Sequence, residues 1–188
     1  MHRIRPQESK IMKGYSLALG LVLVVSTAAC ASDSHSEDKR ASSINAIHAA
    51  VIQQLVESDN TFGPDHRFSE VLIVDHEAAE AEDYMSQGRP GDPLTEEQRS
   101  AISAAVEHLS PVRFIGNPSD FIRQDVLQPV IPGSAIITLA PVEFDRQGAT
   151  VGVSLWCGGV CGLWLTYRVA EGPDGWTVVG TEGNIAIS

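Results

Sequence analysis

The sequence predicts an α+β domain in which N-terminal helices pack on a C-terminal antiparallel β-meander. Within residues 44–55, isoleucine, valine and leucine recur every three or four positions, which is the period of one helix face. From Ser134 onward, short apolar runs alternate with turn sequences such as DRQG and GPDG, which is typical of consecutive strands. Helices early in the chain and strands late indicate helices that cover one face of a sheet.

Several elements are expected before the strand-rich half. The segment SSINAIHAAVIQQLVESD predicts an amphipathic helix with Ser42 or Ser43 at its N-cap, and FSEVLIVD predicts a strand. A second helix opens at TEEQ, because Thr95 and Gln98 have the spacing of a capping box, and Pro111 marks its end. The segment VRFIG predicts a further strand, and NPSDFIRQDV predicts a helical turn.

The first 29 residues have the three-part layout of a secretory signal peptide. Basic residues come first, the apolar run of residues 17–25 follows, and small residues lead to Cys30. This run is about half of the roughly 20 residues that a membrane-spanning helix needs, so cleavage is favoured over a permanent span. Met12 is a second candidate start, because MKGYSLALGLVLVVSTAAC is a complete signal by itself.

The end of this segment, STAAC, resembles the lipobox of bacterial lipoproteins, in which small residues lead to the cysteine that becomes the lipidated first residue. Ala29 beside Cys30 matches the motif, whereas Thr27 stands where that family most often has leucine. The resemblance implies several acyl chains on Cys30, which attach the chain to a membrane in the cell envelope, outside the cytoplasm. Ordinary cleavage without a lipid remains the alternative.

Residues 30–43 are expected to hold the lipidated cysteine and a flexible tether. They are small and polar and show no apolar periodicity, and as a random coil they would reach about 20 Å. Residues 44–188 suit a single globular α+β domain.

The charge of the chain excludes some partners. Residues 1–29 hold four of the 13 Lys and Arg residues and one of the 24 Asp and Glu residues, so nine basic and 23 acidic residues remain after cleavage. The remaining part contains one lysine, Lys39, and no basic run. Nucleic acid and anionic lipid head groups are therefore not expected as partners.

The segment SLWCGGVCGLWLTYRV predicts a hairpin in which Cys157 faces Cys161. In this register one face carries only apolar pairs, and the other is mixed and could meet solvent. The apolar pairs are Leu155 with Leu163, Val153 with Leu165, Val151 with Tyr167, and Ala149 with Val169, and the mixed pairs are Trp156 with Gly162, Ser154 with Trp164, Gly152 with Thr166, and Thr150 with Arg168.

This hairpin predicts a structural disulfide between Cys157 and Cys161. Opposed residues of antiparallel strands have Cα atoms about 4.5 to 5.5 Å apart, which a disulfide can join. Gly158 and Gly159 permit a tight loop, and Gly162 permits a bulge or close approach. A redox-active pair is typically Cys-x-x-Cys at a helix start, and a metal site needs further ligands, so both are weaker readings.

The C-terminal part also resembles a group of uncharacterised bacterial secreted proteins and lipoproteins that carry a Cys-Gly-Gly-x-Cys-Gly hairpin. The matching segments are WCGGVCGLWLTYRV, GWTVVG and IAIS, in this order, and the likeness is close over about the last 55 residues. The resemblance implies a location and a fold without an activity.

Other candidate chemistry is weaker. His76, Glu77 and Glu80 form His-Glu-x-x-Glu, close to a zinc-protease motif, but an exposed acidic segment is the favoured interpretation. Trp156 and Trp164 could stack on a ligand, although packing explains two aromatic residues on strands as well. Three further residues are expected at the surface because they lie on otherwise ordinary segments: His48, Asp65 and His66.

No catalytic residue, metal ligand or cofactor is therefore predicted. The expected function is that of an envelope-anchored, non-catalytic interaction or accessory domain, held to the membrane through Cys30. The alternative is a small-molecule-binding or hydrolytic domain with a pocket between the helices and the sheet.

Overall fold

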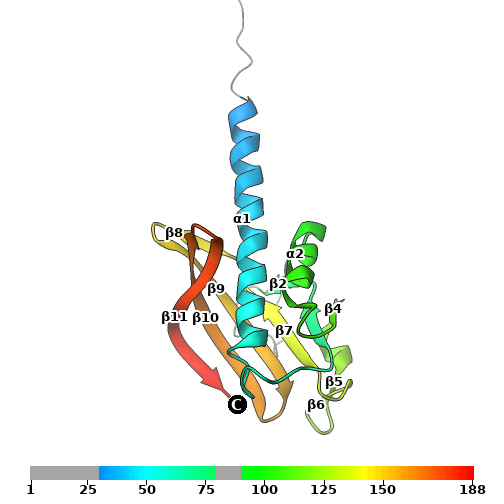
Figure 1. Cartoon of the computed structure of the whole chain (residues 1–188). Coiled ribbons are helices and arrows are strands. Elements are labelled where there is room, and N and C mark those ends of the chain that lie inside the picture. Colours follow the sequence, from blue (N-terminus) through cyan, green and yellow to red (C-terminus); the bar gives the residue numbers. More distant parts are fainter. Residues whose placement is uncertain (1–29, 79–89) are drawn as a thin grey trace, which may run out of the picture.

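The structure is a computed structural model that describes residues 30–78 and 90–188. In these residues, two α-helices lie on one side of a twisted sheet, and smaller strands and a short 3-10 helix surround it (Figure 1). The elements are α1 (Cys30–Glu57), β1 (Val71–Val74), β2 (His76–Ala78), β3 (Pro90–Pro93), α2 (Glu96–Val106), β4 (Val112–Ile115), η2 (Pro118–Phe121), β5 (Ile122–Arg123), β6 (Gln128–Pro129), β7 (Ala135–Leu139), β8 (Glu143–Asp145), β9 (Gly148–Gly158), β10 (Cys161–Gly172) and β11 (Gly175–Ile187).

The main sheet has the strand order β11-β10-β9-β7-β1-β4, and β8 pairs with β9. The strands β9, β10 and β11 pair antiparallel with their neighbours in sequence, and β7 is antiparallel to β9. By contrast, β1 runs parallel to both β4 and β7. The predicted α+β class is confirmed, and the sheet is mixed.

One apolar core joins the helices to the sheet. All four residues of β1 are buried, and alternate residues face opposite sides of the sheet, as the pleat requires. On the helix side, buried side chains of α1 and α2 meet those of β1, β7, β9 and β10. The central members of this core are Ile47, Val51, Leu55, Ile73, Ile102, Val106, Ile137, Leu139, Val153, Leu155 and Tyr167.

A second, smaller core lies on the other side of the sheet. Trp156 of β9 is buried there against Leu72 and Ile136, and the segment that contains η2 and β5 packs over them with Phe121 and Ile122. Packing, as the sequence suggested, accounts for Trp156. This face of the hairpin could have met solvent by its sequence, but at Trp156 the segment with η2 and β5 covers it.

Helix α1 is longer than predicted. It begins at Cys30, so residues 30–43, which were expected to form a flexible tether, are helical. The physical reason is that a packed helix nucleates its own extension, which costs little in a segment with alanine, glutamate, lysine and arginine. In Figure 1 this part of α1 stands out from the rest of the domain. As a helix, residues 30–43 span about 20 Å.

Helix α2 begins as its sequence predicts. The hydroxyl of Thr95 accepts a hydrogen bond from the Gln98 backbone N–H, and the Gln98 side chain accepts one from the Thr95 backbone N–H. Ile102 and Val106 are fully buried, as expected for its apolar face. The predicted turn at Pro118 is the 3-10 helix η2, with Asn117 as its N-cap.

The predicted register of β9 and β10 is confirmed from Ala149–Val169 to Trp156–Gly162. The ladder then shifts by a bulge, so that Cys161 pairs with Gly158 rather than directly with Cys157. A side chain at position 162 would collide with the ring of Trp164, which explains the glycine there. The hairpin therefore ends in a bulge and a tight turn at Gly159 and Val160.

Candidate functional site

Seven large apolar side chains are exposed at one end of the domain. Most sit beside or within the turn that joins β9 to β10, and Val160 in that turn is 88% exposed. They come from four separate parts of the chain, and we refer to them together as the apolar tip. The members of the apolar tip are Phe62, Val126, Leu127, Val130, Val160, Ile185 and Ile187.

The turn between β9 and β10 contacts the connection between β5 and β6. The backbone N–H of Gly159 donates a hydrogen bond of 2.8 Å to the carbonyl oxygen of Leu127. Gly158 has a φ of 149° and leaves space for the Gln128 side chain, which a Cβ atom there would approach to 3.2 Å. These contacts place Val126 and Leu127 beside Val160.

Two further segments meet the same turn. The hydroxyl of Thr61, which precedes Phe62, lies 3.4 Å from Cys161 Sγ. The backbone N–H of Ser188, which follows Ile187, donates to the carbonyl oxygen of Gly162 at 3.0 Å. Residues that are distant in sequence are thus held around the cysteine pair.

Leu127 has an unusual backbone. Its φ is 50°, the left-handed region that favours glycine and is uncommon for a leucine. Although the side chain is apolar, it is exposed rather than packed in a core. Backbone strain of this kind is concentrated at functional sites, because other contacts must maintain it.

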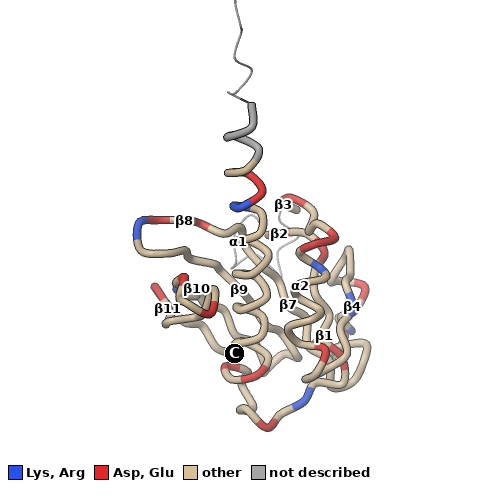
Figure 2. The backbone as a smooth tube through the Cα atoms, turned by 45° about the horizontal axis from the view of Figure 1, so that its top comes forward, with Lys and Arg blue, Asp and Glu red and all other residues tan. Residues whose placement is uncertain are grey.

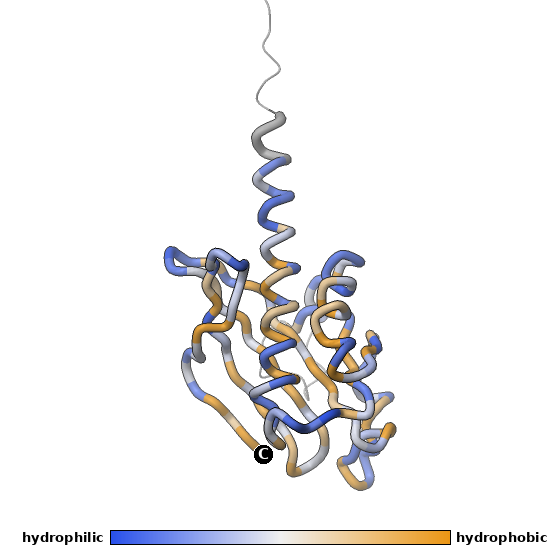
Figure 3. The backbone as a smooth tube through the Cα atoms, viewed as in Figure 1, coloured by the Kyte–Doolittle hydropathy of each residue, from blue (hydrophilic) through white to orange (hydrophobic). Residues whose placement is uncertain are grey.

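The apolar tip lies at the end of the domain away from the first turns of α1. In Figure 1 the start of α1 is at the top, while β6, the turn between β9 and β10, and the C-terminus are at the bottom. Figure 3 shows apolar segments among polar ones at this lower end. Large exposed apolar groups that are close together commonly mark contact surfaces.

Cys157 and Cys161 lie at disulfide distance, with Cα atoms 5.1 Å apart. This separation is within the range expected from the hairpin. Cys161 is buried and Cys157 is half-buried, so the pair closes the apolar stripe of the sheet beside the apolar tip. Cys30, the candidate lipid attachment site, is the first residue of α1.

His48 is a second feature, and its position corrects an expectation. It was expected at the surface, but it is fully buried on the side of α1 that packs against the rest of the domain. Its Nδ1 lies 3.4 Å from Gln98 Nε2, and its Nε2 has no hydrogen-bond partner among the described residues. The signal was present in the sequence, because His48 is one turn after Ile44 and three residues before Val51, on the apolar face.

The environment of His48 keeps it neutral. Burial lowers the pKa of His48 to about 4, and the nearby polar backbone of Ala140 opposes this only in part. Glu77 Oε1 lies 3.9 Å from His48 Nε2. Burial, followed by the nearby charge of Asp92, raises the pKa of Glu77. The contact between His48 and Glu77 is therefore not an ion pair at neutral pH.

The zinc-protease-like motif does not assemble in the described residues. His76 and Glu77 lie on a strand, β2, and not on a helix. His76 Nδ1 lies 3.1 Å from Asp75 Oδ1, whereas Glu77 faces His48. Glu80 falls outside the described residues. Within residues 30–78 and 90–188, no three His, Cys, Asp or Glu side chains are placed to bind one metal ion.

His66 and Asp65 lie in the loop after α1. Asp65 is exposed, as expected, but His66 is half-buried, with its ring centroid 4.3 Å from that of Phe62 and 4.7 Å from that of Phe68. These ring contacts order the loop that carries Phe62 to the apolar tip.

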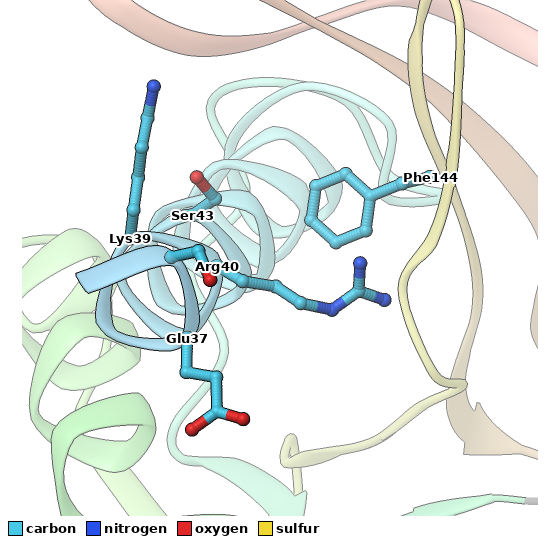
Figure 4. A pocket seen from close by; sticks show the side chains of 6 residues that line it. Glu37, Lys39, Arg40, Ser43 and Phe144 are labelled. Atoms are coloured by element: carbon cyan, nitrogen blue, oxygen red, sulfur yellow. The ribbon is translucent and has the colours of Figure 1, made fainter. Parts of the chain in front are cut away.

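A shallow groove of about 450 Å³ lies between the outer part of α1 and β8. The guanidinium group of Arg40 lies over the Phe144 ring, 4.6 Å from its centroid (Figure 4). A stacked arginine of this kind adds a favourable cation–π contact. It links the outer part of α1 to the sheet.

Comparisons with known proteins do not assign the chain to a family. No family model, no curated protein and no solved structure matches it. Neither helix in the described part of the chain is long and apolar enough to cross a membrane.

Proposed function

We propose that this protein is an envelope-anchored lipoprotein whose single domain is a non-catalytic interaction domain. The anchor is the acylated Cys30, the partner in the membrane is the lipid bilayer itself, and a disulfide joins Cys157 and Cys161. N-terminal helices packed on a C-terminal antiparallel meander provide a rigid body for the apolar tip. Helix α1 would hold this body away from the membrane surface.

The observation that carries the proposal is the position of the apolar tip. Its seven exposed residues belong to segments beside the turn between β9 and β10, which lies at the end of the domain away from the start of α1 (Figure 1). A domain attached through Cys30 would present them to another component of the envelope rather than to its own membrane. Removing such exposed apolar surface from water is the main favourable term in protein association.

The packing between the helices and the sheet favours an interaction domain rather than a ligand-binding or hydrolytic domain. A pocket there would need polar side chains that point from the sheet into a cavity. Instead, most of the buried side chains of α1, α2 and the central strands that meet there are apolar, and the buried polar residues His48 and Gln98 contact each other. This packing is the reason that the ligand-binding alternative is not developed further.

The anchoring is tested by the intact mass of the mature protein from native membranes. We expect a mass that includes a diacylglyceryl or triacyl group on Cys30. Thiol labelling in the same sample should leave Cys157 and Cys161 unmodified until a reductant is added. An unlipidated chain with freely labelled thiols would contradict both the anchor and the disulfide.

The interaction is tested by cross-linking in intact envelopes. The variant Val160→Lys places a charge in the apolar tip, and Val179→Lys places the same charge on β11, where Val179 is 59% exposed outside the tip. We expect Val160→Lys to lose a specific cross-linked species that Val179→Lys retains. Equal cross-linking in both variants would contradict the proposed role of the tip.

A further inference from the structure

The strand β11 forms one edge of the main sheet. It is 13 residues long, and among the described residues no strand pairs with its outer side. Its backbone groups on that side are therefore available to another extended chain. The last residues of this strand belong to the apolar tip.

The backbone of these last residues is oriented by its bonds to β10. Ser188 N–H donates to the Gly162 carbonyl, and Ala186 lies opposite Trp164. In an antiparallel pair the hydrogen-bonding groups of successive residues point alternately to one side and to the other. The N–H and C=O groups of Ile185 and Ile187 consequently point to the free edge.

The side chains add apolar surface to this edge. Ile185 is 51% exposed and Ile187 is 70% exposed. Alternate residues of a strand share one face, and Ile187 lies opposite the buried Leu163. The two isoleucines therefore extend the apolar stripe of the sheet beyond the part that is covered.

Few features protect this edge from pairing. The strand β11 contains no proline and no lysine, the residues that commonly block an edge. Its one charged side chain, Glu182, lies 3.7 Å from Arg168. A register shift around Gly183, which has a φ of 74°, restricts regular pairing to the few residues after it.

We propose that the free edge of β11 at Ile185 and Ile187 binds an extended, apolar and basic segment of a partner protein as an added antiparallel strand. This inference rests on the proposed interaction role of the apolar tip and names the partner class. Main-chain hydrogen bonds would supply affinity, and alternate side chains of the segment would contact the tip.

Charge complementarity selects a basic segment. The whole chain has a net charge of −11, and the part after residue 29 is more acidic still. Two exposed carboxylates are next to the tip in sequence: Asp65 follows Phe62 by three residues, and Asp125 directly precedes Val126. Arg123 lies 3.6 Å from Asp125, whereas Glu182 lies farther along β11, 3.7 Å from Arg168. Figure 2 shows acidic residues distributed over the domain and few basic ones. Complementary charge favours the encounter and the choice of partner.

A second copy of this chain fits the edge less well. Two β11 strands that pair antiparallel about a twofold axis point in opposite directions, and α1 runs in roughly the same direction as β11 (Figure 1). The two Cys30 residues would then lie on opposite sides of the dimer, which is incompatible with one membrane. Two strongly acidic domains also repel each other.

The test uses the purified, oxidised protein from residue 30 onward in its acylated, detergent-solubilised form. The probe is a capped peptide of alternating lysine and valine, with two controls: a glutamate–valine peptide, and the lysine–valine peptide with alternate amides N-methylated. Backbone hydrogen exchange is followed by NMR. We expect the lysine–valine peptide to slow exchange at Ile185 and Ile187, and each control to bind about tenfold or more weakly.

The variant Ile187→Pro removes one outward N–H and should weaken the lysine–valine peptide about tenfold, whereas Val179→Lys should not. A peptide that fails to bind, or binds without slowing exchange at Ile185 and Ile187, overturns the inference. Slower exchange at Ile185 and Ile187 in the presence of anionic vesicles, or in dimers of the free protein, also overturns the inference. If Val160→Lys loses the envelope cross-link but these results fail, the interaction role stands and strand addition does not.

Discussion

The hydroxyl group of Tyr167 donates a hydrogen bond of 2.7 Å to Oδ2 of Asp59. Tyr167 is fully buried in β10, and Asp59 lies two residues after the end of α1. Burial, and then the hydrogen bond and charge of Asp59, raise the pKa of Tyr167, so its hydroxyl remains a donor at all relevant pH values. This bond ties the end of α1, and the loop that carries Phe62, to the sheet.

The variant Tyr167→Phe should lower the free energy of unfolding by about 1 to 3 kcal/mol, because it leaves the half-buried Asp59 carboxylate without this donor. Urea denaturation at neutral pH measures the loss. Asp59 retains a second donor, Gln54 Nε2 at 3.1 Å, so the loss should not be larger. A double variant with Asp59→Asn should lose less than the sum of the single variants, and strict additivity would contradict a direct interaction.

The burial of His48 predicts a loss of stability in mild acid. Its folded pKa of about 4 lies below the value of 6.5 for a free histidine, so the unfolded chain binds more protons between these values. The contribution of His48 to the free energy of unfolding is fully present above pH 6.5 and is lost as the pH falls to about 4. The loss amounts to about 3 kcal/mol. Denaturation curves at successive pH values measure it.

The variant His48→Gln is the control for this effect. It should be less stable than the wild type at pH 7, but it should lack the decline between pH 6.5 and 4 that His48 causes. Glu77 acts in the opposite direction, because its raised pKa favours the folded state at low pH and disfavours it as the pH rises through that pKa. An equal decline in the variant and the wild type would show that other groups cause the acid sensitivity.

Breaking the link between Cys157 and Cys161 should disturb the apolar tip more than the core. A disulfide that closes so short a loop contributes about 2 kcal/mol. We expect the double variant Cys157→Ser, Cys161→Ser to lose about this much stability. Its Gly159 amide should also exchange faster, because that N–H donates to Leu127 in the connection between β5 and β6. Amide exchange measures the local effect.

The matched control is addition of a reductant, which should reproduce both effects in the wild type and change nothing in the serine variant. Faster exchange spread evenly over β7, β9 and β10 would instead indicate that the pair stabilises the whole sheet.

Local sequence signals predicted the elements that depend on local chemistry. The capping box at Thr95 and Gln98 is formed by residues three apart, and the alternation of apolar residues in β9 and β10 fixes their register. The parallel pairing of β1 with β4 and β7 could not be predicted in this way, because it depends on connections that cross the sheet. These short strands have no periodic pattern that distinguishes parallel from antiparallel partners.

The candidate site was beyond local prediction for a related reason. The apolar tip combines residues from the loop after α1, the connection of β5 to β6, one hairpin turn and the C-terminus. Only Val160, an apolar residue in a tight turn, is unusual by its sequence position alone. His48 was expected at the surface, although its spacing from Ile44 and Val51 places it on the buried face.

A substitution at Leu127 can test the function of the apolar tip separately from its stability. A leucine at φ 50° is strained by about 1 kcal/mol or more, whereas asparagine adopts this region more readily. The free energy of unfolding of the variant Leu127→Asn should therefore equal or slightly exceed that of the wild type. Its cross-linking in the envelope should nevertheless be weaker. The control Val130→Asn changes another exposed residue of the tip, and it should gain nothing in stability because no strain is relieved. A loss of more than about 1 kcal/mol in Leu127→Asn would mean that Leu127 is retained for packing against Gly159, and not for contact with a partner.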